Sequence, residues 1–280
     1  MTTRPTFREG APELLHRPTS ANKQRDLYGV HRISQKRLLS LARQIAEHEK
    51  TVLCSVKQCR FLTTGQIQRL HFTDSNTQSA RIRAANRMLS RLRDAGLLTC
   101  LPRRIGGVRA GSSAAIWKLT TAGHKFLCLS LPQYCPRRSY DPTTNFLRHS
   151  LAVAELYVRL KTDKTLTLQE IQFEPDCWRD KLKPDLYAVT ISNKYAYHWF
   201  FEIDRDTEAP VRIISKCRRY ADYYRSGAEQ KLRGVFPLVV WLVPDEKRKT
   251  SLEQHIKSEM GGFGKLFNVR IFDEQLNFTA

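Results

Sequence analysis

The 280-residue sequence lacks several features that define common protein classes. It has no run of about 18 apolar residues, so no segment is expected to span a membrane. The first residues, 1–5, carry no apolar core of a secretory signal. None of the seven cysteines forms a C-x-x-C pair, which argues against a zinc site or a disulfide framework. We therefore expect a cytoplasmic protein with reduced, buried cysteines.

Acidic residues are scarce compared with basic ones. The chain has 27 Asp and Glu against 47 Lys and Arg, which gives a formal net charge of +20. An excess of this size favours a nucleic-acid partner, whose phosphates the cations would neutralise. An anionic membrane surface is the alternative, but the sequence shows no lipidation motif or basic amphipathic anchor. We expect double-stranded DNA as partner and no membrane.

The apolar content of 41% is enough for a hydrophobic core, and the length fits two domains. Residues 1–33 mix Pro, Gly, Thr and Arg without a period, which predicts a flexible basic arm. Apolar residues at helical spacing follow over 38–46, and Thr63 or Thr64 can cap a short helix that carries Ile67 and Leu70.

A longer amphipathic helix is predicted over 79–95, with Gly96 as its C-cap and an apolar side formed by Ile82, Ala85, Leu89 and Leu92. Strands are predicted over 97–101 and 115–119, joined by a basic tip. This order predicts a winged helix-turn-helix over residues 34–129.

Arginines dominate the polar side of the predicted helix 79–95 and the tip between the two strands. Arginine suits bidentate contacts to phosphate and guanine, and a DNA-recognition helix needs one apolar and one cationic side. A solvated basic helix in a protein–protein module is the alternative. The predicted DNA-binding residues are Arg81, Arg83, Arg87 and Arg91 on the helix and Arg103, Arg104 and Arg109 at the tip.

Three prolines mark residues 130–144 as a linker. Beyond it, residues 145–280 predict helix 145–161, strands 165–174, 184–191 and 197–204, helix 208–225, strand 236–243, helix 246–259 and strand 267–273. The expected fold class is therefore α/β (α+β): a winged helix followed by a domain of αβββαβ order with an additional α-β unit.

Acidic residues stand at the edges of two neighbouring predicted strands. Pro184-Asp185 begins one strand, and Glu202-Ile203-Asp204 ends the next. Because strands alternate faces, Glu202 and Asp204 are expected on one side, close to Asp185. Carboxylates at such a short distance repel one another unless a cation compensates their charge, and oxygen ligands favour Mg²⁺ or Mn²⁺. The same residues could alternatively form an ordinary polar strand edge.

Two further residues fit the predicted metal site. Glu155 on helix 145–161 could supply another ligand, and Lys216 on helix 208–225 could neutralise charge on a phosphate. The predicted catalytic residues are Asp185, Glu202, Asp204 and Lys216, and the predicted metal ligands are Asp185, Glu202, Asp204 and Glu155. A covalent mechanism through Tyr220, Tyr223 or Tyr224 is disfavoured, since no three-histidine cluster accompanies these tyrosines.

The αβββαβ order with Pro-Asp and Glu-x-Asp resembles the PD-(D/E)XK phosphodiesterase superfamily over roughly residues 145–245. The resemblance implies metal-dependent hydrolysis of a phosphodiester. In one respect the sequence departs from the superfamily pattern, which has a lysine at the position of Asp204. If the site is active, Lys216 would have to act in its place from the helix.

A narrower resemblance extends over about residues 40–245. The segments 62–66 (LTTGQ), 117–123 (WKLTTAG), 148–153 (RHSLAV) and 201–208 (FEIDRDTE), followed by Lys216 and Tyr220, resemble the replication-relaxation proteins of plasmids and integrative elements. The resemblance implies a role in element replication and DNA relaxation, which would require a nick.

Together these patterns predict a DNA-binding, Mg²⁺- or Mn²⁺-dependent endonuclease that nicks the DNA of a mobile element. The alternatives are a catalytically inactive accessory protein with a degenerate nuclease fold, and a transcription regulator whose second domain only dimerises. A homodimer would suit a palindromic site, and replication or conjugation proteins are further expected partners.

Overall fold

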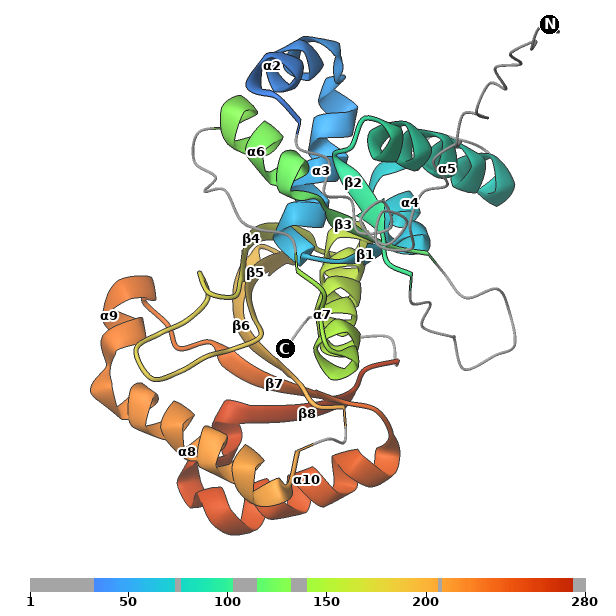
Figure 1. The fold of residues 1–280 in the computed structure, drawn as a ribbon. Coiled ribbons are helices and arrows are strands. Elements are labelled where there is room, and N and C mark those ends of the chain that lie inside the picture. The colour runs from blue at the N-terminus through green and yellow to red at the C-terminus, as the bar shows by residue number, and fades with distance from the viewer. Residues whose placement is uncertain (1–32, 74–76, 103–114, 132–139, 206–207, 274–280) are drawn as a thin grey trace, which may run out of the picture.

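The computed structural model describes residues 33–73, 77–102, 115–131, 140–205 and 208–273. The fold is mixed α/β with two sheets, as expected. Figure 1 shows helices around a small sheet in the first half of the chain, and a larger sheet between helices in the second half. No helix among the described residues has both the length and the apolar character needed to cross a membrane.

The first half contains the predicted short helix, the long helix and two strands, together with two elements that are not among the predictions, α3 and β1. Its strands form an antiparallel sheet in the order β1-β3-β2. The elements are α2 (Gln35–Gln44), α3 (Glu47–Cys59), β1 (Leu62–Thr63), α4 (Thr64–His71), α5 (Gln78–Asp94), β2 (Leu98–Cys100), β3 (Ile116–Leu119) and α6 (Thr121–Ser130).

Two motifs of the first half hold this sheet and its helices together. The Thr63 hydroxyl accepts a hydrogen bond from the backbone N–H of Gln66, and the Gln66 side chain accepts one from the N–H of Thr63, which forms a capping box. Trp117 pairs with Leu62 across the sheet and donates its indole N–H to the Thr64 hydroxyl at 2.9 Å. The LTTGQ and WKLTTAG segments therefore meet at one place.

Gly123 in the second of these segments is required by a close backbone approach. A Cβ at this position would lie 2.2 Å from the carbonyl oxygen of Leu97. The preceding Thr120 caps α6 by accepting from the N–H of Gly123, and its hydroxyl donates to the carbonyl oxygen of Gly96. The end of α5 is thereby fixed to the start of α6.

The second half has the predicted αβββαβ order with the additional α-β unit, plus the short helices α9 and η1. Its sheet has the order β4-β5-β6-β7-β8, antiparallel up to β6 and parallel from β6 to β8. The elements are α7 (Thr144–Thr162), β4 (Thr167–Phe173), β5 (Leu186–Ser192), β6 (Tyr195–Ile203), α8 (Pro210–Ser226), α9 (Ala228–Arg233), β7 (Leu238–Val243), α10 (Glu246–Met260), η1 (Gly261–Leu266) and β8 (Phe267–Ile271).

The predicted hairpin joins β5 and β6 through a two-residue turn. Ser192 pairs with Tyr195, and both Asn193 and Lys194 between them have positive φ, at 49° and 70°. Positive φ at both central residues is the geometry of a type I′ turn, which matches the twist of the flanking strands. The turn fixes the register that brings the ends of β5 and β6 together.

Helices cover both faces of the five-stranded sheet. Val153 and Tyr157 of α7 share one apolar cluster with Phe201 and Ile203 of β6. Residues of α8 and α10 share a second cluster with Phe200 of β6 and with alternate residues of β7. Figure 1 shows α7 on one side of the sheet and α8 with α10 on the other. Since side chains alternate along β6, Glu202 and Asp204 face the α8 side.

Helix α7 also joins the two halves. Val56 and Cys59 of α3 belong to the same apolar cluster as Val153 and Tyr157 of α7, so the halves share a core. Most of the predicted linker, residues 132–139, lies outside the described residues. At its end, Lys118 of β3 forms a 2.8 Å ion pair with Asp141.

Candidate functional site

Asp185 and Glu202 lie opposite each other at the ends of β5 and β6. Leu186 pairs with Phe201, so the preceding Asp185 faces Glu202 across the strand pair. The Asp185 N–H donates to the carbonyl oxygen of Phe201 at 3.1 Å, and the N–H of Ile203 donates to Asp185 Oδ2 at 2.7 Å. These hydrogen bonds continue the ladder by one residue and hold the Asp185 carboxylate against the end of β6, next to Glu202.

Two residues of α8, one helical turn apart, bind the Glu202 carboxylate. Lys216 forms an ion pair with Glu202 Oε2, and the Tyr220 hydroxyl donates to Oε1 at 2.7 Å. The Glu202 side chain is 0% exposed. The lysine that the superfamily pattern expects at position 204 is absent, but a lysine from α8 contacts the glutamate of the same motif.

The cluster shifts the ionisation of its members in opposite directions. Burial raises the pKa of Glu202 to about 8, and Asp185 adds to the rise while Lys216 and Tyr220 limit it. Burial alone would lower the pKa of Lys216, but the carboxylates of Glu202 and Asp185 outweigh that effect and raise it. Burial would likewise raise the pKa of Asp185, but its hydrogen bond and charge interaction with His149 lower it.

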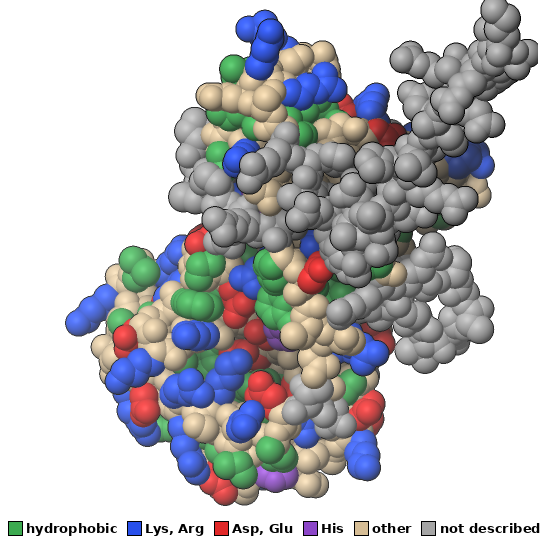
Figure 2. All heavy atoms as spheres, in the orientation of Figure 1, with side chains coloured by type: hydrophobic (Ala, Val, Ile, Leu, Met, Phe, Trp, Pro, Cys, Tyr) green, Lys and Arg blue, Asp and Glu red, His purple; other side chains and the backbone are tan. Residues whose placement is uncertain are grey.

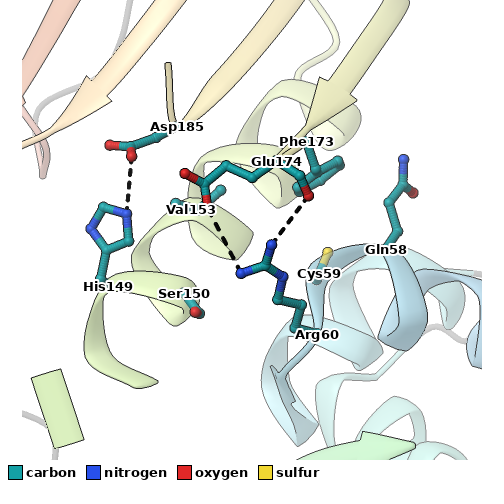
Figure 3. A pocket seen from close by; sticks show the side chains of 9 residues that line it. All are labelled: Gln58, Cys59, Arg60, His149, Ser150, Val153, Phe173, Glu174 and Asp185. Atoms are coloured by element: carbon teal, nitrogen blue, oxygen red, sulfur yellow. Dashed lines mark hydrogen bonds and ion pairs between the residues drawn. The ribbon is translucent and has the colours of Figure 1, made fainter. Parts of the chain in front are cut away.

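His149, near the start of α7, lies on the other side of Asp185. Its Nε2 is 3.1 Å from Asp185 Oδ1. Burial alone would lower the pKa of His149, but the Asp185 carboxylate outweighs burial and raises it. Figure 3 shows His149 pointing from α7 towards Asp185. The histidine thus holds the carboxylate that faces Glu202.

A small cavity opens beside this pair, at the junction of the two halves. Its volume is about 30 Å³, which is room for about two water molecules. Figure 3 shows Arg60 of the first half, paired with Glu174, on the side opposite His149 and Asp185. The Arg60 guanidinium donates to the Glu174 carbonyl oxygen at 3.2 Å and lies 3.7 Å from its carboxylate. The first half therefore reaches the segment that leads to Asp185.

The other two predicted metal ligands are bound by arginines. Asp204 lies on the same side of β6 as Glu202, but its carboxylate is 2.5 Å from Arg248 of α10. Glu155 is six residues beyond His149 on α7, which turns it about 240° around the helix. It faces the first half, where Arg69 forms an ion pair with it at 2.5 Å and Gln66 donates to it at 3.2 Å.

Replacing Glu155 with Gln should destabilise the chain by about 1–2 kcal/mol at pH 7, because Arg69 loses the carboxylate that ties α4 to α7. Burial opposes ionisation of Glu155, but Arg69 and Gln66 outweigh it and lower the pKa of Glu155. A lowered pKa gives stability above pH 4.5 that is lost as the pH falls through the folded-state value. Urea unfolding should therefore show the difference at pH 7 and none near pH 3.

The matched control is Glu253→Gln on the exposed side of α10, which should leave the unfolding midpoint unchanged. Cleavage of DNA by the Glu155 variant, if the wild type cleaves, should also be retained. Loss of a metal-dependent activity without loss of stability would instead identify Glu155 as a ligand.

Two residues of the site, Asp185 and Glu202, carry the kind of oxygen atoms that a divalent cation binds. Among the residues that the structure describes, no group of three or more His, Cys, Asp or Glu side chains is placed to hold a metal ion. Mg²⁺, however, commonly takes one or two carboxylates and keeps several waters. Asp185 and Glu202 offer carboxylates on adjacent strands. Burial raises the pKa of Glu202, and the Asp185 charge adds to that rise, an interaction of like charges that a cation would reduce.

The predicted recognition helix α5 presents arginines on its outer side. Arg83 and Arg87 are exposed, and neither forms an ion pair with a residue in the described ranges. Arg91 instead binds the buried Glu49 of α3 at 2.7 Å. Arg81 is half-buried. The tip residues Arg103, Arg104 and Arg109 lie outside the described residues.

The predicted apolar side of α5 is correct for Ala85, Leu89 and Leu92, which are buried. It is wrong for Ile82, which is 39% exposed. No residue from Gln78 to Ala84 is buried, and Gln78 donates a hydrogen bond to the Gln68 side chain of α4 at 3.0 Å. The first turns of α5 therefore lie near the surface, where the exposed Ile82 adjoins the exposed Arg83.

Three contacts of the site were not among the sequence-based assignments: His149 on Asp185, Tyr220 on Glu202 and Arg248 on Asp204. His149 had a signal in its position on an otherwise apolar helix face, and Tyr220 in its spacing of four from Lys216. Arg248 had none, because its contact with Asp204 depends on how α10 packs beside β6.

Comparison with known protein families places the chain in one of them. The model of the replication-relaxation family matches residues 53–239, which include α4, α5 and the whole cluster around Asp185 and Glu202. No curated protein and no solved structure matches the chain.

Proposed function

Because the chain belongs to the replication-relaxation family, we propose that it is a DNA-binding, metal-dependent endonuclease that nicks the DNA of a plasmid or related element. Family membership supports a role in the replication or relaxation of such an element. The nick is the step that relaxation of a closed circle requires. The observation that carries the chemical part of the proposal is the buried cluster of Asp185, Glu202 and Lys216.

Each residue of the cluster has a distinct part in the proposed reaction. Asp185 and Glu202 would hold Mg²⁺ or Mn²⁺, which would supply Lewis-acid activation of the scissile phosphate and of a water molecule. Lys216 carries a positive charge next to Glu202, where it can stabilise the charge that develops on phosphate. His149 keeps Asp185 oriented and ionised through its contact with Oδ1.

Arginines around the cluster give the second half a surface for backbone phosphates. Arg212 and Arg219 of α8, Arg148 of α7 and Arg205 after β6 are all exposed. Figure 2 shows Lys and Arg side chains over this face of the second half, around a hollow in which carboxylate and histidine side chains are visible. A phosphate backbone lying across α8 and the start of α7 would pass the cluster.

The first half supplies the contact with duplex DNA in this proposal. The support is the order α4-α5-β2-β3, in which two helices precede two strands, together with the exposed arginines of α5. Helix α7 packs against both halves, so DNA held by α5 stays in a fixed relation to the cluster.

Replacing both Arg83 and Arg87 with Ala should weaken duplex binding by at least about tenfold and reduce the slope of log affinity against log salt by about two. Each arginine contact to a phosphate releases about one counterion on binding, so losing two contacts lowers the number released by about two. Fluorescence anisotropy with a labelled duplex at several KCl concentrations measures both quantities. Arg43→Ala, an exposed arginine on α2, should leave both unchanged, and an equal loss in this control would contradict the assignment to α5.

Incubation of the wild-type protein with supercoiled plasmid of its native element tests the function directly. With Mg²⁺ or Mn²⁺ we expect open-circle product, and with EDTA we expect none. Product that persists in EDTA would contradict metal dependence. Linear product in place of open circle would show that the protein cuts both strands and does not nick.

The second candidate is a DNA-binding accessory protein with no nuclease activity. It is favoured by the way protein groups already bind the carboxylates: Glu202 by Lys216 and Tyr220, and Asp185 by His149 and the Ile203 N–H. In that case the plasmid stays supercoiled with Mg²⁺ or Mn²⁺ as it does with EDTA, and the protein still binds duplex DNA in a salt-dependent way.

A further inference from the structure

Trp178 is unlike the other three tryptophans of the chain. Trp117, Trp199 and Trp241 are 6%, 1% and 2% exposed, whereas Trp178 is 40% exposed. It lies in the segment 174–184 between β4 and β5, outside the apolar clusters of the sheet. A large aromatic ring left in solvent on a loop is available to a ligand.

A lysine covers the ring of Trp178. The Lys183 ammonium lies 4.6 Å from the ring centroid, within the range of a cation–π contact. Lys183 is followed by Pro184 and Asp185, so its Cα lies at most about 7.6 Å from that of Asp185. A cation with an aromatic ring beside it therefore stands two residues before the aspartate of the candidate site.

The segment that carries Trp178 is held in place at several points. The Cys177 thiol donates to the carbonyl oxygen of Pro184 at 3.0 Å, which closes the loop at its base. Arg179 forms a 3.1 Å ion pair with the buried Glu229 of α9, and Arg60 of the first half binds Glu174. A ring on a braced segment loses little conformational entropy when a ligand stacks on it.

We propose that Trp178 and Lys183 bind an unpaired stretch of DNA and lead it to Asp185. A base stacks on the indole, and the ammonium it displaces binds the adjoining phosphate. Aromatic rings beside cations are the means by which proteins bind single strands without reading their sequence. The inference rests on the proposed function, because the strand to be nicked must pass Asp185.

The charges of the segment indicate that stacking dominates this contact. Lys181 and Lys183 are exposed, but so are Asp176 and Asp180. The four charges balance, so the loop by itself attracts phosphate weakly. Binding at Trp178 should accordingly depend less on salt than duplex binding at α5 does.

Titration with a single-stranded oligothymidylate, followed by tryptophan fluorescence, tests the proposal. The other three tryptophans are buried, so quenching on stacking should come from Trp178. We expect quenching in the wild type and in Asp185→Asn. Trp178→Leu should lose the quenching and bind a labelled single strand about tenfold more weakly by anisotropy, with duplex affinity unchanged. Trp178→Phe should lose the quenching and retain most of the affinity.

Equal single-strand affinity of the wild type and Trp178→Leu would overturn the proposal. So would a change in oligomeric state as the sole effect of Trp178→Leu in size-exclusion chromatography, since the ring would then be a protein contact. Nicking and strand binding fail separately: a protein that quenches on single strands but never nicks keeps the Trp178 site and loses the nuclease.

Discussion

Asp185→Asn should reduce nicking of supercoiled plasmid by at least about 10³-fold while leaving duplex affinity unchanged. Asparagine has the shape of aspartate, and its oxygen can still accept from the Ile203 N–H. The substitution removes the negative charge, however, and with it a ligand of the proposed cation. Loss of Lewis-acid stabilisation is worth several kcal/mol, and each 1.36 kcal/mol is about tenfold in rate. The measurement is the initial rate of open-circle formation with Mg²⁺ or Mn²⁺.

Thermal melting provides a readout of the same site that does not need turnover. A ligand that binds only the folded state raises the melting temperature in proportion to the logarithm of its concentration. Mn²⁺ should raise the melting temperature of the wild type and not that of Asp185→Asn. Equal nicking by the two proteins would place the chemistry elsewhere. Absence of both nicking and the melting shift, with duplex binding retained, would favour the accessory protein.

The secondary structure of the second half could be predicted because its signals are local. Apolar runs of strand length, a hairpin turn at Asn193-Lys194 and the i, i+3, i+4 pattern of α8 each specify one element. Alternation along β6 also predicts that Glu202 lies on the face opposite Phe201, as it does.

Helix α3 is not among the predicted helices, although its buried residues Val52, Leu53, Val56 and Cys59 recur at helical spacing. Val52 and Val56 are β-branched, and Cys54 and Ser55 are weak helix formers, so the helix propensity of the segment is low. Packing against α6, α7 and β3 stabilises the helix instead. Long-range contacts of this kind are not encoded in any local pattern, so the shared core of the two halves was not predictable either.

The contacts of single residues in the candidate site also depend on long-range packing that the local sequence does not predict. Local sequence places His149 and Glu155 on one helix, and their separation of six already excludes a common face. It does not say which face meets β5 and which meets α4. In the structure, His149 contacts Asp185 and Glu155 forms an ion pair with Arg69. The pairing of Lys216 with Glu202 likewise depends on how α8 packs on the sheet.

Lys216→Met should destabilise the folded chain by about 3 kcal/mol or more at pH 9, because it leaves the buried Glu202 carboxylate without its cation. The sign follows from the pKa of Glu202, which burial raises to about 8 from its ordinary value of 4.5. Because the pKa of Glu202 is raised in the folded state, the contribution of this carboxyl group to stability is full below pH 4.5 and is lost as the pH rises through 8. Lys216 limits the rise in the Glu202 pKa. Without Lys216 that pKa is higher, so the loss of folding stability continues to higher pH.

The difference between Lys216→Met and the wild type should therefore grow as the pH rises above 8, and urea unfolding at pH 6 and pH 9 measures it. Adding Glu202→Gln to Lys216→Met removes the ionisable group, so this double variant should regain most of the stability and lose the pH dependence. Lys257→Met, an exposed lysine of α10, is the matched control and should change little at either pH. A difference that is constant from pH 6 to pH 9 would mean that the methylene packing of Lys216, and not its charge, stabilises this part of the fold.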